Sequence, residues 1–128
     1  MLIDWPAEFD AYLTRLEESA DPIDRQRLRL LQAELSILQR LDRAPTEDTP
    51  SLKQVRQARR YPVWRVSHPY REGVAVRLIV WFPTTGRAVI ALFAGDKARM
   101  GDVFYDSVGT RADAAIEAWI VQSREEEK

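Results

Sequence analysis

The stretch from Tyr61 to Lys97 constrains the fold of this chain more than any other part of the sequence. Valine, isoleucine, tryptophan and phenylalanine are dense in three short runs, and glycine and proline mark the connections between them, which is typical of consecutive strands. The runs comprise residues 62–67, 74–82 and 88–95. Two hairpins in succession predict an antiparallel meander, and residues 2–5 could add a fourth strand at its edge.

Arginines interrupt the apolar runs of this predicted sheet at Arg65 and Arg77. In the middle run, the alternation of side chains along a strand places Arg77 on the same side as Ile79 and Trp81. A basic residue in such a position has two explanations. It either pairs with acidic residues of helices packed around the sheet or belongs to a site that binds an anion.

Helical periodicity precedes and follows the predicted sheet. Asp4 is a candidate cap for a first helix, whose apolar face comprises Phe9, Tyr12, Leu13 and Leu16. Asp21 and Pro22 form a clear start for a second helix that runs to about Leu41. The apolar face of this second helix comprises Leu28, Leu31, Leu35, Ile37, Leu38 and Leu41.

The third predicted helix begins after Thr110, with Asp113 as the partner in a capping box. The preceding residues, 98–109, are too rich in glycine and aspartate to predict one regular element. Together these patterns predict a single α+β domain over residues 1–128. Two N-terminal helices and a C-terminal helix would pack on a three- to four-stranded antiparallel sheet.

Composition excludes several classes of protein. The chain contains no cysteine, which rules out disulfides, thiolate nucleophiles and zinc sites built from cysteine. The longest apolar runs are far shorter than the roughly 20 residues of a membrane span, and the N-terminus carries acidic residues where a signal peptide needs basic ones. We therefore expect a cytoplasmic protein that does not enter the membrane.

The net charge of −1 conceals a strong asymmetry along the chain. Residues 53–101 hold 10 basic and 2 acidic residues, a balance of +8 that coincides with the predicted sheet. The flanking segments balance at −5 for residues 1–52 and −4 for residues 102–128. Clustered positive charge of this kind indicates a polyanionic partner, most often nucleic acid. Neutralisation of the sheet by the acidic helices is the alternative.

The residue types available for chemistry are limited. The single histidine, His68, cannot build a metal site or a Ser-His-Asp triad, and no phosphate-binding glycine-rich loop is present. Arginine, lysine and tyrosine remain. These residue types can bind phosphodiesters, and they can also assist attack by a ribose 2′-hydroxyl on its own phosphate without a metal. The segment from Lys53 to Arg60 is either a solvated loop or an edge that contacts phosphate.

The order of these elements resembles the RelE/ParE toxin superfamily of type II toxin–antitoxin systems, closest to its HigB-like and Gp49-like members. The resemblance covers nearly the whole chain. It is carried by Leu52-Lys53, Trp64-Arg65-Val66, Arg77 within VRLIVWF, Ala94-Gly95-Asp96-Lys97 and Phe104-Tyr105. It implies a RelE-like fold and a ribosome-dependent mRNA endoribonuclease that needs no metal or other cofactor. The implied partners are the ribosome, mRNA and a cognate antitoxin, expected to be a helix-turn-helix protein.

The same resemblance implies roles for individual residues. The catalytic candidates are Arg65, Arg77, Lys97 and Tyr105. The RNA-binding candidates are Lys53, Arg56, Arg59, Arg60 and Arg99. Arg77 would stabilise the cleaving phosphate, while Lys97 and Tyr105 would transfer protons or, for the tyrosine, stack on a base. Two other functions fit the same fold: inhibition of DNA gyrase in the manner of ParE, and non-catalytic binding of a partner by a phage accessory protein.

Overall fold

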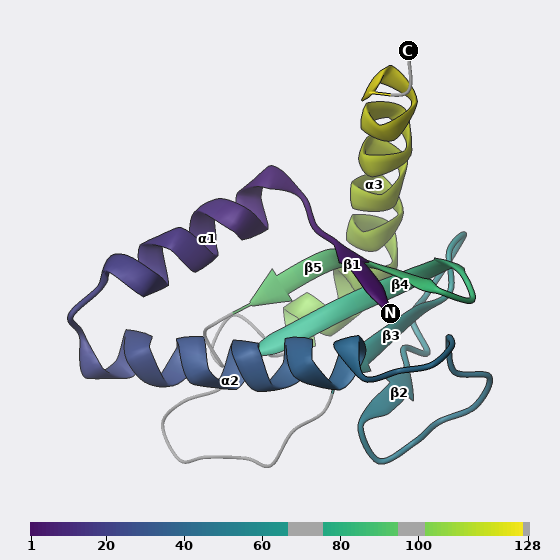
Figure 1. The fold of residues 1–128 in the computed structure, drawn as a ribbon. Coiled ribbons are helices and arrows are strands. Elements are labelled where there is room, and N and C mark those ends of the chain that lie inside the picture. Colours follow the sequence, from purple (N-terminus) through teal and green to yellow (C-terminus); the bar gives the residue numbers. More distant parts are fainter. Residues whose placement is uncertain (67–75, 95–101, 127–128) are drawn as a thin grey trace.

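The computed structural model describes residues 1–66, 76–94 and 102–126, which form three helices and one sheet (Figure 1). The strands are β1 (Leu2–Asp4), β2 (Leu52–Gln54), β3 (Val63–Val66), β4 (Arg77–Thr84) and β5 (Arg87–Ala94). The helices are α1 (Ala7–Glu18), α2 (Pro22–Gln39) and α3 (Asp102–Glu126). The predicted α+β class is therefore confirmed.

The sheet differs from the prediction in strand number and in direction. It has five strands in the order β1-β5-β4-β3-β2, and β1 lies parallel to β5 while the other pairs are antiparallel. The expectation of three or four antiparallel strands was wrong on both counts. The sequence of β1 carries no information about its direction, because its partner lies more than 80 residues away in the chain. The short β2 falls where the sequence shows no apolar alternation, and only its pairing with β3 makes it a strand.

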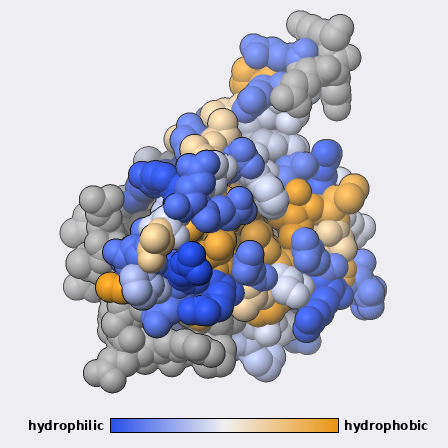
Figure 2. Space-filling model, turned by 60° about the vertical axis from the view of Figure 1, so that its left-hand side comes forward, coloured by the Kyte–Doolittle hydropathy of each residue, from blue (hydrophilic) through white to orange (hydrophobic). Residues whose placement is uncertain are grey.

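Helices cover both faces of the sheet. The α1–α2 hairpin packs on one face, where the leucines of α2 meet Leu78 and Val80 of β4. On the other face, Val108, Ala112 and Ile116 of α3 pack against apolar side chains that include Ile79. The C-terminal end of α3 projects beyond the rest of the molecule in both views (Figures 1 and 2). None of the described helices is long and apolar enough to cross a membrane.

The N-cap predicted for the first helix is wrong, and the N-cap predicted for the second helix is confirmed. Asp4 does not cap α1; Pro6 occupies the N-cap position, and the Asp4 carboxylate instead pairs with Arg87 at 2.7 Å. The start of α2 agrees with the prediction. The Asp21 side chain accepts a hydrogen bond of 2.7 Å from the backbone N–H of Ile23, and Pro22 is the first helical residue.

The start of α3 also differs from the prediction. The helix begins at Asp102, so Thr110 lies in its interior and Asp113 is not part of a capping box. Gly109, one of the residues that suggested a break, lies inside α3 and allows another segment to pack closely against the helix. A methyl group added at Gly109 would lie 2.0 Å from the backbone carbonyl oxygen of Gln57, so only glycine lets that segment approach the helix.

Candidate nucleic-acid interface

The register of the sheet brings three predicted site residues together at one end. Lys53 of β2 lies directly opposite Arg65 of β3, and Arg65 lies opposite Ile79 of β4. Arg77 is two residues before Ile79 on the same strand, so it lies on the diagonal from Arg65, at a backbone distance of about 7–8 Å for such pairs. By the alternation of strand residues, all three side chains belong to the sheet face that packs on α3, the face of Ile79.

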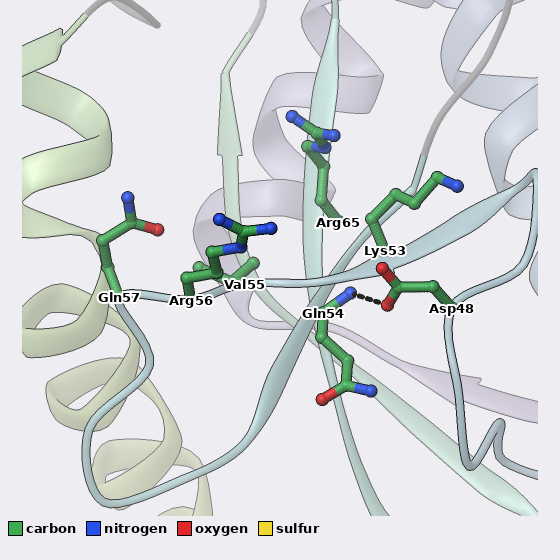
Figure 3. Close-up of a pocket in the computed structure, with 7 residues that line it drawn as sticks. All are labelled: Asp48, Lys53, Gln54, Val55, Arg56, Gln57 and Arg65. Carbon is green, nitrogen blue, oxygen red and sulfur yellow. Dashed lines mark hydrogen bonds between the residues drawn. The ribbon is translucent and has the colours of Figure 1, made fainter.

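A pocket of about 430 Å³ opens beside two of these residues (Figure 3). The side chains of Lys53, Arg65 and Arg56 extend to the same side of β2, whereas Gln54 points to the opposite side. Asp48 closes one edge and accepts a 2.8 Å hydrogen bond from the backbone N–H of Gln54. The lining residues are Asp48, Lys53, Gln54, Val55, Arg56, Gln57 and Arg65. Their formal charges give the pocket a balance of +2.

The electrostatics of the pocket favour an anion. Lys53 and Arg65 lie directly opposite each other on neighbouring strands, so two positive charges face the same pocket. Both side chains are only partly exposed, so water screens their charges less than it would on an open surface. A phosphate placed between them would accept a charge-assisted hydrogen bond from each.

The arginines of the neighbouring loop are held in different ways. This segment, residues 55–62, connects β2 to β3 and is called the basic loop below. Its Arg56 lines the pocket, while the side chain of Arg59 lies against Gly109 of α3. Arg60 pairs with Glu117 of α3 at 2.6 Å, and its guanidinium stacks over the Tyr61 ring. Of the three predicted RNA-binding arginines in the loop, the structure therefore brings Arg56 to the pocket.

Sequence reasoning missed one ionisable residue near this end of the sheet. Glu34 of α2 is 0% exposed and lies in the buried stripe between Leu31 and Leu38. Burial raises the pKa of the Glu34 carboxyl to about 9, although the positive charge of Arg77 and the backbone N–H of Leu78 oppose that rise. The signal was present in the sequence as a polar residue at a position where the helical repeat calls for leucine.

The protonation of Glu34 bears on the charge of the site. With a pKa of about 9 the carboxyl is neutral at physiological pH. Arg77, the partly buried arginine at the start of β4, lies near enough for its positive charge to lower the pKa of this carboxyl.

Three predicted site residues cannot be placed in full. Lys97 and Arg99 lie outside the described residues. Tyr105 belongs to the first turns of α3, but its side chain is also outside the described part of the structure. Within residues 1–66, 76–94 and 102–126 there is no cluster of histidine, aspartate or glutamate that could hold a metal ion.

Comparison with known proteins leaves the family open. No family model, no curated protein and no solved structure matches the chain.

Proposed function

We propose that this protein binds single-stranded RNA through the cationic end of its sheet and cleaves it, as a toxin of the RelE/ParE type acting on mRNA at the ribosome. The observation that carries the proposal is the Lys53–Arg65 pair, two cations opposed across neighbouring strands in a pocket with a balance of +2. A phosphodiester that lies between two such cations can accept a charge-assisted hydrogen bond from each of them.

The chemistry follows from the residue types. The ribose 2′-hydroxyl attacks its own phosphate, the new O2′–P bond forms, and the P–O5′ bond breaks to leave a 2′,3′-cyclic phosphate and a 5′-hydroxyl. Arg65 and Arg77 stabilise the additional negative charge of the pentacovalent phosphate, because a fixed guanidinium offers two parallel donors. Lys97 and Tyr105 are the candidates for accepting the 2′ proton and supplying one to the leaving oxygen.

The proposal includes partners and a compartment. The protein works in the cytoplasm, where ribosomes carry its substrate, and a small antitoxin with a helix-turn-helix domain neutralises it by covering the cationic surface. A short neighbouring gene encoding such a protein would support this part of the proposal.

Expression without the antitoxin tests the activity. Induction of the wild type should arrest growth and give transcripts ending in 2′,3′-cyclic phosphate or 3′-phosphate. Arg65→Ala should abolish both effects. The matched control is Arg29→Ala, which removes an exposed arginine from α2, a helix on the opposite face of the sheet, and should leave both effects intact. Growth arrest with intact transcripts would refute the ribonuclease proposal.

A second candidate function is binding without catalysis, as in an inhibitor of DNA gyrase. It is favoured by one observation: among the seven residues lining the pocket, Lys53 and Asp48 are the only side chains suited to proton transfer, and an Asp48 oxygen already accepts the backbone N–H of Gln54. Gyrase supercoiling assays with the purified protein separate the two functions, since only the gyrase inhibitor would act without ribosomes. A partner-binding protein of the same fold, such as a phage accessory protein, would be inactive in both assays.

A further inference from the structure

One face of α3 forms a docking surface for the basic loop. Gly109, Asp113 and Glu117 are spaced four residues apart, which places them in a row along the helix. Each of the three contacts the loop. The backbone carbonyl of Gln57 lies against Gly109, two loop N–H groups point at Asp113, and Arg60 pairs with Glu117.

Asp113 is the strongest of these contacts. Its Oδ2 accepts the backbone N–H of Arg60 at 3.1 Å, and its Oδ1 accepts the backbone N–H of Tyr61 at 3.1 Å. A carboxylate that accepts two adjacent backbone donors fixes the backbone as well as the side chains, and hydrogen bonds to charged groups are the stronger kind. The ion pair between Arg60 and Glu117 is well exposed and contributes little by comparison.

The position of the loop determines the shape of the pocket. Arg56 and Gln57 line the pocket, and Gln57 is also the residue whose carbonyl packs on Gly109. Only two residues separate Gln57, which lines the pocket, from Arg60, whose backbone N–H bonds to Asp113. This short segment of the loop is therefore held at both ends. If the loop came away from α3, Arg56 would lose its fixed place beside Lys53 and Arg65.

We propose that Asp113 is a positioning residue for RNA binding: it holds the basic loop on α3 and thereby places Arg56 in the wall of the phosphate pocket. The inference rests on the proposed function, because it assumes that RNA occupies this pocket. Asp113 itself does not contact the RNA. Its effect is to order the loop before binding, so that the cost of ordering is not subtracted from the affinity.

Asp113→Asn is the decisive variant. Asparagine has the same shape but only one acceptor oxygen, so one of the two loop N–H groups would face an amide N–H. We expect the affinity for a fluorescent single-stranded RNA oligonucleotide to fall about tenfold. In the same variant, the amide protons of Arg60 and Tyr61 should exchange with solvent faster, while thermal unfolding stays cooperative.

Glu117→Gln provides the matched control. It makes the same change in net charge on the same face of α3, so a purely electrostatic effect of removing an acid would appear equally in both variants. If positioning is the cause, Glu117→Gln should bind RNA with an affinity within about twofold of the wild type or tighter, because Arg60 is released.

A double variant links Asp113 to Arg56. If Asp113 acts through Arg56, then Arg56→Ala combined with Asp113→Asn should bind RNA no more weakly than Arg56→Ala alone. Additive losses would overturn the inference, as would an Asp113→Asn protein that binds RNA like the wild type. A wild-type protein that fails to bind RNA at all would refute the proposed function, which is a different and distinguishable result.

Discussion

Glu34 shows how a single side chain can set the pH response of this fold. Its carboxyl is buried in the leucine stripe of α2, beneath the start of β4, where an apolar side chain of similar size would be cheaper to bury. The ordinary pKa of 4.5 applies in the unfolded chain, whereas the folded carboxyl titrates near 9. Because the folded state holds this proton more tightly, the contribution of Glu34 to the free energy of unfolding is greatest below pH 4.5 and falls as the pH rises toward 9.

Glu34→Gln should therefore stabilise the protein at neutral pH. The amide keeps the shape of the protonated acid but has no proton to lose, so the cost of keeping the carboxyl neutral disappears. From the distance between pH 7 and the ordinary pKa, the gain is at most about 3 kcal/mol in the free energy of unfolding. Urea denaturation at pH 5, 7 and 9 measures it.

The same series of urea denaturations at three pH values supplies the control. Wild-type stability should decline from pH 5 to pH 9 relative to Glu34→Gln, and the two proteins should converge at the acid end. Glu18→Gln, at an exposed position on α1, should retain the wild-type pH profile. If the wild type and Glu34→Gln show parallel pH profiles, Glu34 does not titrate in the way that its burial requires.

At the scale of elements, α3 contains Gly109 in its interior, although glycine has a low helix propensity. Replacing Gly109 by alanine removes an unfavourable helix residue and would gain about 1 kcal/mol in an isolated helix. In this protein the new methyl group would meet the Gln57 carbonyl oxygen at 2.0 Å. We expect Gly109→Ala to lower the free energy of unfolding by about 1–3 kcal/mol, because the loop backbone must shift. Thermal unfolding measures the loss.

Gly86 is the matched control for this substitution. It lies in the turn between β4 and β5, and a methyl group added there would meet nothing within 4 Å. Gly86→Ala should leave the melting temperature within about two degrees of the wild type, because surface substitutions usually change the free energy of unfolding by no more than about 0.5 kcal/mol. Equal melting temperatures for the two alanine variants would show that the approach of the loop to α3 is looser than the structure has it.

The elements that sequence could predict are those with local signals. The strands β3, β4 and β5, the Asp21–Pro22 start of α2 and its leucine face all follow from short-range patterns. The missed features depend on tertiary partners. The strand β2 exists through its pairing with β3, and the first turns of α3 continue through Gly109 because the basic loop packs there. In the candidate site, Lys53 and Arg65 could be named in advance, but their opposition across two strands required the register.

At the scale of the whole molecule, the fold separates the charges that the sequence carries in blocks. The basic segment includes β3, β4, β5 and the basic loop, while α1 and α3, which pack on opposite faces of the sheet, each carry a net negative charge. The side of the surface shown in Figure 2 has hydrophilic side chains around a cluster of hydrophobic ones near its centre. A protein with a net charge of −1 can therefore present a local balance of +2 at its pocket, and its association with a polyanion depends on that site rather than on overall attraction.

Salt dependence measures how many cations the pocket brings to RNA. Each phosphate neutralised on a single strand contributes about 0.7 to the slope of log affinity against log salt concentration. If Lys53, Arg56 and Arg65 each engage one phosphate, the wild-type slope should be about −2. Lys53→Ala should reduce its magnitude by about 0.7, and Arg29→Ala should leave it unchanged. Anisotropy titrations of a single-stranded RNA oligonucleotide between 50 and 200 mM salt, roughly the range in which such contacts are resolved, give the slopes. Equal slopes for the wild type and Lys53→Ala would place the RNA away from the Lys53–Arg65 pair.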